Sequence, residues 1–555
     1  MKNLKYIFLI LIFSGCQKIF HEEDYKISKI GSSEEMDIAL NGLYGRLAQY
    51  INQPGMPPQY LADDFPNQQY QGSKYSEYGN DFAKVNWQRL YNIITSANNI
   101  ICQFQNSTII KNEIKPGLGE AHLLRAYAYF RLVRIFGQVP IVNNIEVNYS
   151  LPKSSFKDIY AFIESDLLKA AGYLPVNKAM ARIPNQSPVI GSARAMLAEV
   201  YLTMGGYPLL DNTKYIQAAL VARTVIDSAI NYGFDLLPDY ANLWDGTDIQ
   251  NREVVFGLFF SEHGSTKIVH YDTTRYSDGT YSYGTYTTWN FNIETTNSYN
   301  FFDAFLSSGT PYYILPEKLF FSSFPASYRK DITFQTIFLS TASTLEFNNS
   351  DSIYYTKITK YTPYKSLEWR SDIFYKKFGY YIQYDSLSVL TTFGHRVFDP
   401  YDGQYYLISD STTGKLGKNY YMNMGQSIYI YRYAHVLLNY AEAKARSGQL
   451  DASAYEAVNM IRRRANKVDI HSSSKYDLQP DLSAQQFADS VVNERAWEFC
   501  AEPEGRWFDL LRLEMIEQLP KLKNYTVPPP IPVFTKSDYF EAIPNGDKVL
   551  NPNLK

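Results

Sequence analysis

The spacing of apolar and polar residues predicts a mainly α-helical protein. Over most of the first 230 residues, and again from residue 431 onward, apolar residues recur every three or four positions, which is typical of amphipathic helices. Residues 120–136 are apolar almost all round, which indicates a helix packed between other helices. We expect helices at residues 32–52, 81–105, 120–136, 156–173, 191–205, 212–230, 431–446 and 452–465.

Two of the predicted helices carry the same dipeptide at matching points, Arg125-Ala126 and Arg194-Ala195, which lie 69 residues apart. That separation is close to two periods of a tetratricopeptide repeat, at ~34 residues each, and a further predicted helix lies between them. We therefore predict a tetratricopeptide-like helix-pair scaffold, in which neighbouring pairs bury each other's apolar faces. The helices at 431–446 and 452–465 form another such pair.

Residues 251–426 differ from the helical regions in composition and pattern. A strand-like apolar run at 253–260 is followed by stretches rich in Tyr, Thr, Ser and Gly, with apolar residues throughout. We predict a long loop-rich insertion that carries short strands. A second, shorter loop is predicted at residues 53–80, where four prolines exclude a continuous helix. Binding residues often lie on such loops, held in place by a rigid scaffold.

The N-terminus predicts a lipoprotein signal peptide. Lys2 and Lys5 precede an apolar run at 6–13, and the motif F-S-G-C that ends at Cys16 resembles a bacterial lipobox, with Phe where Leu is usual. We predict lipid attachment at Cys16, which anchors a protein to a membrane surface without a spanning helix. An ordinary cleaved signal peptide is the alternative. The predicted segments are a signal peptide at 1–15, a tether at 16–30, a helical repeat scaffold at 31–250 that includes the loop at 53–80, the insertion at 251–426, and a C-terminal helical pair with a charged segment and tail at 427–555.

The composition favours a recognition surface over an enzyme. The net charge is −3 and no basic cluster occurs, so nothing indicates a nucleic-acid partner. Aromatic residues make up 16% of the chain and 49 are tyrosines, whose apolar ring and polar hydroxyl suit wet interfaces. No catalytic or cofactor-binding motif occurs, and no metal or cofactor is predicted. We interpret His122 and His435 as core histidines, and Cys102 and Cys500 as buried free thiols, with a disulfide as the alternative.

The densest run of charged and aromatic residues is N-E-R-A-W-E-F-C-A-E-P-E-G-R-W-F-D-L-L-R at residues 493–512. Glu494, Glu498 and Glu502 would share one face of a continuous helix, and a glycosidase needs two carboxylates roughly 5–10 Å apart. Arginines interleave with them, however, and an adjacent arginine lowers the pKa of a carboxyl, the wrong direction for a general acid. The aromatic residues are spaced to pack inward. We interpret residues 493–512, the signature segment, as a salt-bridged structural clamp between two helices.

This segment resembles the pattern E-R-x-x-E-[FL]-x-x-E-G-x-R-[WF]-x-D-L-x-R of the SusD/RagB family, surface lipoproteins of Bacteroidetes that capture nutrients; Pro503 is a departure from it. Residues 87–98 resemble the W-x-x-x-Y-x-x-I-x-x-A-N helix of the family, residues 551–554 its N-P-x-L ending, and the acidic run at 22–24 its surface-export signal. The resemblance spans the chain. It implies helical repeats, an outer-membrane location, no catalytic residues, and a partner, the SusC-type TonB-dependent transporter, to which ligand is passed.

Capture of an oligosaccharide or polysaccharide at the cell surface is the leading hypothesis, because flat aromatic rings match the C–H faces of sugars. In the family, ligand meets the N-terminal loop and the central insertion. Those regions hold the candidate ligand-binding residues Tyr70, Tyr75, Tyr78, Tyr283, Tyr286 and Trp289. Trp87 is excluded, because it occupies a core helical position. The alternatives are a peptide-binding member of the family, a helical glycoside-acting enzyme that uses the glutamates, and a scaffold that holds partner chains.

Overall fold

The computed structural model of the 555-residue chain describes the helical scaffold and the points where its loops attach. The described residues are 30–51, 62–64, 80–105, 110–146, 148–244, 248, 250–259, 318–335, 428–523 and 533–555, with short strands between 274 and 407. Within these ranges, no helix combines the length and the apolarity that a membrane span requires.

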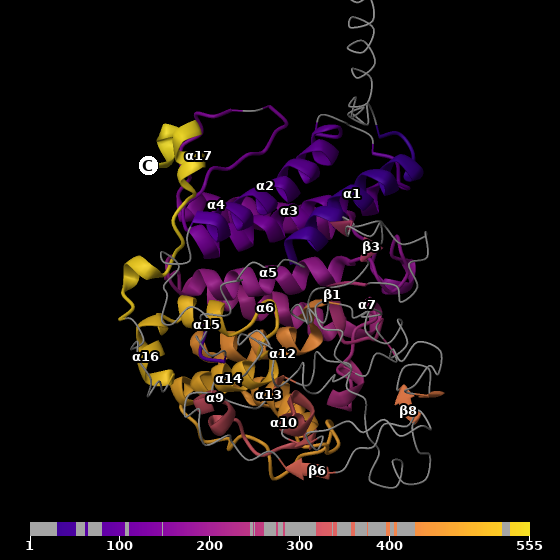
Figure 1. The fold of residues 1–555 in the computed structure, drawn as a ribbon, viewed down its shortest axis with the longest axis vertical. Coiled ribbons are helices and arrows are strands. Elements are labelled where there is room, and N and C mark those ends of the chain that lie inside the picture. Colours follow the sequence, from indigo (N-terminus) through magenta and orange to yellow (C-terminus); the bar gives the residue numbers. More distant parts are fainter. Residues whose placement is uncertain are drawn as a thin grey trace, which may run out of the picture.

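The first half of the scaffold is a stack of helices, each packed mainly against its neighbours in sequence (Figure 1). Its helices are α1 (Ser33–Ile51), α2 (Asn80–Cys102), α3 (Lys115–Phe136), α4 (Phe156–Tyr173), α5 (Ile190–Gly205), α6 (Thr213–Asp227) and α7 (Ala229–Tyr232). Helix α3 is buried from Gly117 to Phe136 because α1, α2 and α4 pack around it. This burial explains why its sequence is apolar on nearly every face.

The second half continues the stack below α5 and α6 in Figure 1. Its helices are α12 (Tyr433–Arg446), α13 (Ala452–Ala465), α14 (Ala484–Glu498), α15 (Arg506–Arg512), α16 (Leu519–Leu522) and α17 (Asn545–Leu550). Helix α12 packs against α5 and α6 on one side and against α13 and α14 on the other. It therefore joins the two halves into one core.

The helices follow the predicted periodicity closely. Helices α4 and α13 have the predicted bounds, and α1, α2 and α5 differ from prediction by one to three residues at an end. Helix α3 begins at Lys115 rather than at residue 120, because Pro116 is accommodated in its first turn. The helix predicted at 212–230 is wrong as one element, because the chain breaks at Ser228 between α6 and α7.

A two-stranded antiparallel pair closes the base of the insertion. Strand β1 (Val254–Leu258) lies within the apolar run predicted as a strand and pairs with β10 (Ile428–Arg432), and every residue of both strands is buried. The predicted start at residue 431 was therefore wrong, because β10 occupies that position and α12 begins at Tyr433. The insertion also contains α9 (Lys318–Ser323), α10 (Tyr328–Thr333) and the pairs β2 (Thr274–Arg275) with β3 (Tyr281–Ser282), β4 (Phe334–Gln335) with β7 (Phe374–Tyr375), β5 (Ile337–Ser340) with β6 (Lys357–Lys360), and β8 (Arg396–Asp399) with β9 (Gln404–Leu407).

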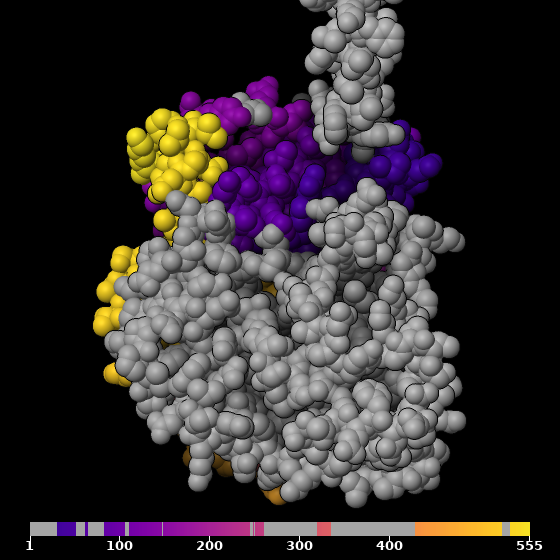
Figure 2. Space-filling view, in the orientation of Figure 1, coloured from indigo at the N-terminus to yellow at the C-terminus, as the bar shows by residue number. Residues whose placement is uncertain are grey.

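The C-terminal residues return to the first helices. Asn551 donates to the carbonyl of Leu151 at 2.7 Å, and the Lys153 ammonium donates to the carbonyl of Lys555 at 3.0 Å. Phe540 packs its ring 5.5 Å from that of Phe156. Figure 2 shows the yellow C-terminal residues against the purple helices of the first half. We call residues 533–555 the C-terminal strap.

Candidate functional site

The six aromatic residues predicted to bind ligand lie outside the described residues, as does Cys16. The structure does describe the points at which the loops that carry them attach to the scaffold. The central insertion attaches at Glu253, Arg329 and Arg432, and the N-terminal loop attaches at residues 62–64. All of these points meet the signature segment or its immediate partners.

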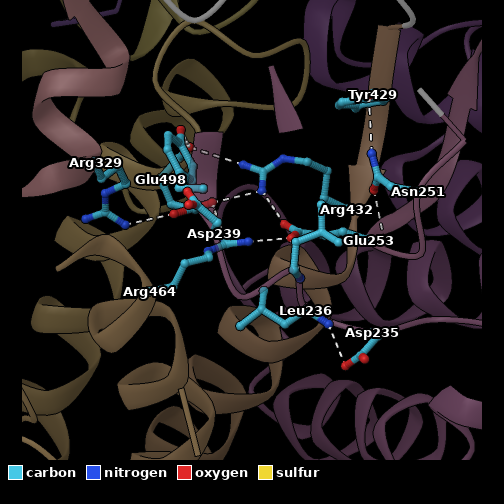
Figure 3. A network of polar contacts seen from close by, with 12 residues as sticks. Asp235, Leu236, Asp239, Asn251, Glu253, Arg329, Tyr429, Arg432, Arg464 and Glu498 are labelled. Carbon is cyan, nitrogen blue, oxygen red and sulfur yellow. Dashed lines mark hydrogen bonds and ion pairs between the residues drawn. The ribbon is translucent and has the colours of Figure 1, made fainter. Parts of the chain in front are cut away.

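A buried cluster of ion pairs, the central cluster, lies at the base of the insertion (Figure 3). The Arg432 guanidinium, at the end of β10, donates to Glu253 at 2.6 Å, to Glu498 at 2.8 Å and to Glu502 at 2.9 Å. Arg464, from α13, contacts Glu253 and lies 2.7 Å from Glu498. The cluster ties the two ends of the insertion, at Glu253 and Arg432, to the signature segment.

Helix α10, from within the insertion, adds a third point of attachment. Arg329 lies 2.7 Å from Glu494 and 2.8 Å from Glu498, and its side chain is 2% exposed. Glu494 also meets Arg462 of α13 at 3.2 Å. The cluster thus contains four arginines and four glutamates, so its formal charge balances: Arg329, Arg432, Arg462, Arg464, Glu253, Glu494, Glu498 and Glu502.

The arginines decide the protonation of Glu498. Burial alone would raise the pKa of this carboxyl, but Arg464, Arg432 and Arg329 together hold it well below its usual range. The carboxylate is therefore ionised, fully buried and engaged by three arginines. It cannot serve as a general acid, which needs a raised pKa. The clamp interpretation agrees with this geometry.

The predicted single face of glutamates is wrong in one respect. Helix α14 ends at Glu498, and Ala501 adopts a left-handed backbone with φ of 60°. Glu502 therefore lies beyond the helix and reaches Arg432 from a turn. Helix α14 therefore ends before the chain reaches Pro503 and Gly505.

A second buried cluster fixes the end of the signature segment. Asp509 lies 2.9 Å from Arg495 and 2.8 Å from Arg512, and Arg512 also contacts Glu442 of α12 at 2.7 Å. Burial would raise the pKa of Glu442, but Arg512 and Arg446 lower it to about 2. This cluster ties α14 and α15 to α12, at the middle of the scaffold.

The N-terminal loop meets the same segment. The Arg506 guanidinium donates to both oxygens of Asp63, at 2.7 and 3.0 Å, and the Ala501 amide donates to Asp64 at 2.8 Å. Burial, with the neighbouring charge of Asp63, raises the pKa of Asp64 to about 7. Two carboxylates of the loop at 53–80 are therefore buried on the turn and helix that follow α14.

The aromatic residues of the signature segment pack as predicted, with one exception. Phe499, Trp507 and Phe508 are buried, whereas Trp497 is only partly buried. The Phe499 ring stacks on that of His435 with centroids 3.6 Å apart. Trp87 is 5% exposed and packs edge-on against Phe136, which confirms that it belongs to the core.

The histidines and cysteines largely follow prediction. His122 is buried and forms a hydrogen bond with Asp166 at 2.7 Å. His435 is buried and accepts a hydrogen bond from the backbone amide of Arg432 at 3.0 Å. Both are therefore core histidines. Cys102 and Cys500 are thiols that form no disulfide. Cys500 is buried, but the prediction for Cys102 is wrong: it lies in the last turn of α2, where the side chain is partly exposed. Among the described residues, no group of three or more His, Cys, Asp or Glu side chains is arranged to hold a metal ion.

Comparisons with known proteins place this arrangement in a class of helical-repeat binding proteins. A family model described as "SusD family" matches residues 253–528, and one described as "Starch-binding associating with outer membrane" matches residues 22–202. SusD-like protein P2 of Formosa agariphila is 24% identical over 495 residues, which cover 86% of this chain and 80% of that protein. The chain belongs to the SusD/RagB family.

Solved structures agree with the predicted fold. The crystal structure of a SusD homolog from Bacteroides thetaiotaomicron is 22% identical with a TM-score of 0.65, and the match covers 96% of this chain and 98% of that one. A further crystal structure, determined with a xylogluco-oligosaccharide, is 19% identical with a TM-score of 0.61 and covers 94% of this chain and 98% of the other. The mainly α, tetratricopeptide-like fold class is confirmed.

Proposed function

We propose that this protein is a non-catalytic, cell-surface lipoprotein that captures oligosaccharide or polysaccharide and delivers it to a SusC-type TonB-dependent transporter. The observation that carries the proposal is the common attachment of the N-terminal loop and the insertion to one buried clamp. Such an arrangement holds two aromatic-rich loops on a rigid base, which is how binding residues are commonly presented. The starch-binding description of one matched family, and the xylogluco-oligosaccharide in a structural relative, support a glycan as ligand.

The charges of the clamp support a binding role over a catalytic one. Glu498 is held ionised by three arginines, and Asp509 is held ionised by two, with its pKa well below the usual range despite burial. Catalysis of glycoside hydrolysis needs one protonated carboxyl beside the substrate. We assign the glutamates a structural role, and ligand contact to the candidate rings Tyr70, Tyr75, Tyr78, Tyr283, Tyr286 and Trp289.

The proposed attachment to the outer membrane is a lipid at Cys16. The outer-membrane association named for the family model over residues 22–202 supports that location. Labelling of whole cells with a membrane-impermeant reagent tests surface exposure, and substitution of Cys16 by Ser is expected to release the protein from the membrane fraction. Co-purification with a large β-barrel transporter tests the partner.

Calorimetric titration tests the ligand. A chain that lacks residues 1–21 retains every described residue and is titrated with xyloglucan oligosaccharides, maltooligosaccharides and, for the peptide-binding alternative, oligopeptides. We expect glycan binding, and about a tenfold loss of affinity for each substitution of Tyr75, Tyr78 or Trp289 by Ala, because one stacked ring at a contact hot spot contributes about 1.4 kcal/mol. The melting temperature should stay unchanged.

Tyr149 provides the matched control. Its side chain is 62% exposed and lies in neither loop, so its substitution by Ala removes a similar surface ring without touching the proposed ligand face. Equal affinity losses for Tyr149→Ala and Tyr75→Ala would contradict the assignment of the loops. Clear binding of oligopeptides with no binding of any glycan would replace the glycan proposal with the peptide one.

A further inference from the structure

Residues 318–335 form a small helical unit that lies inside the insertion and packs on the signature segment. They comprise α9, α10 and β4. Phe320, Phe324 and Phe334 form an apolar cluster with Ala496, Cys500 and Ala501 that is separate from the main core. The unit is therefore attached to α14 by apolar contact as well as by charge.

Arg329 supplies the charged contact. Its two terminal nitrogens lie 2.7 Å from Glu494 and 2.8 Å from Glu498, while its guanidinium lies 5.7 Å from the centre of the Phe324 ring. In Figure 3 the Arg329 side chain reaches toward Glu498 from the side opposite Arg432. A buried guanidinium with two carboxylate partners fixes both the position and the orientation of the helix that carries it.

The scaffold does not need Arg329 to pair its own carboxylates. Glu494 also meets Arg462, and Glu498 also meets Arg432 and Arg464. Loss of Arg329 would leave each glutamate with at least one arginine from the scaffold or from the base of the insertion. The loss would also leave one buried negative charge uncompensated and so reduce stability, but only the insertion would lose a point of attachment.

We propose that Arg329 is a positioning residue that holds the middle of the insertion on α14 and thereby increases the affinity of the insertion for its ligand. This inference rests on the proposed function. The insertion is fixed where β1 ends at Leu258, at Arg329, and where β10 begins at Ile428. Three of the candidate rings, Tyr283, Tyr286 and Trp289, lie between the first two of these points.

The size of the effect follows from chain entropy. With the unit at 318–335 attached, the candidate rings lie on a segment closed between residues 258 and 329; full release of the unit would leave the segment closed between 258 and 428. Closure probability falls as the 3/2 power of segment length, so full release would reduce the population of a given loop arrangement about fourfold. Ligand binding must then restore that order, which weakens affinity by about the same factor. The apolar cluster of the unit and the hydrogen bond from Tyr328 to Asp239 remain without Arg329, so fourfold is the upper limit of the effect.

Three variants test the proposal in the chain that lacks residues 1–21. Arg329→Gln removes the contact, Arg329→Lys keeps the charge, and Arg462→Gln removes an arginine from the same Glu494 without touching the insertion. Each is measured by titration with the glycan that the wild type binds, and by amide hydrogen exchange over residues 318–335 and over α14. We expect Arg329→Gln to raise exchange in 318–335 more than in α14 and to weaken binding by up to about fourfold, Arg329→Lys to recover part of the affinity, and Arg462→Gln to match the affinity of the wild type.

Two results would overturn the inference. Unchanged affinity in Arg329→Gln, with faster exchange in 318–335, would show that attachment of this unit does not govern binding. Equal acceleration of exchange in α14 and in 318–335 would show a general structural role instead. If the wild type binds oligopeptides and no glycan, the glycan proposal fails, and the same variants measured with the peptide still decide the role of Arg329.

Discussion

Substitution of Glu498 by Ala is the sharpest test of the clamp. The Glu498 side chain is fully buried and contacts Arg329, Arg432 and Arg464 at 2.8, 2.8 and 2.7 Å. The substitution leaves four arginines with three glutamates, so one buried positive charge becomes uncompensated. Breaking a buried ion pair on one side typically costs ~3–5 kcal/mol.

That cost is not multiplied by three. Each of the three arginines keeps another carboxylate: Arg329 keeps Glu494, while Arg432 and Arg464 keep Glu253. We therefore expect Glu498→Ala to lower the free energy of unfolding by ~3–5 kcal/mol in total, a large share of the ~5–15 kcal/mol that stabilises a typical domain. Urea unfolding measures the loss as a lower midpoint at an unchanged slope.

Glu456→Ala is the matched control on the neighbouring helix α13. The Glu456 side chain is 49% exposed, and its partner Arg463 keeps Asp477, so the expected cost is ~0–1 kcal/mol. A cost for Glu498→Ala no larger than that of this control would contradict a structural role for Glu498. Hydrolysis of a polysaccharide that Glu498→Gln abolishes with the fold intact would instead make Glu498 a catalytic residue.

The lowered pKa of Glu498 determines how its contribution to stability depends on pH. The folded pKa of Glu498 lies well below the ordinary value of 4.5. The carboxylate therefore stabilises the fold above pH 4.5, and this stabilisation is lost as the pH falls. The difference in stability between wild type and Glu498→Ala should shrink below about pH 4, provided both remain folded there.

Two further predictions concern stability away from the central cluster. Burial raises the pKa of Glu541 to about 8, so ionisation costs stability as the pH rises from 4.5 to 8, at ~1.4 kcal/mol per pH unit; Glu541→Gln should raise the melting temperature at pH 8 and leave it unchanged at pH 4, and equal shifts at both would exclude titration as the cause. A Cβ added at Gly206 would lie 2.4 Å from the carbonyl oxygen of Arg512, so Gly206→Ala should cost ~1–3 kcal/mol in urea unfolding. Gly546→Ala, which meets nothing within 4 Å, should cost nothing.

The sequence predicted most helices because their signal is local. An apolar stripe such as Met36, Leu40, Leu43 and Leu47 depends only on residues within one helix, and all four are buried in α1. The predicted helix boundaries are wrong where contact with a segment distant in sequence determines them. Residues 431 and 432 read as helix, yet they pair with β1, which lies more than 170 residues earlier in the chain.

The sequence predicts that the clamp contains ion pairs but does not identify all the residues that form them. Interleaved charges in residues 493–512 indicated ion pairs, and the structure confirms them. The partners Arg329, Arg432 and Glu253 come from three separate stretches of sequence, and no pattern near any of them marks a buried charge. Asp63 lies in the predicted loop at 53–80, and nothing in the sequence around it indicates that its carboxylate is buried on Arg506. Long-range charge pairing leaves no periodic trace in a single sequence.

The C-terminal strap changes how this chain must fold. In an open stack of repeats, each unit needs only its neighbours, and an end can fray without consequence for the rest. Here Asn551 completes a contact with Leu151, 400 residues earlier, and the Glu541 amide bonds the carbonyl of Ile135 at the end of α3. Contacts of such long separation form slowly. The first helices to be synthesised are thus finished by the last residues, so unfolding should be cooperative across the whole stack and an incomplete chain should remain exposed at its beginning.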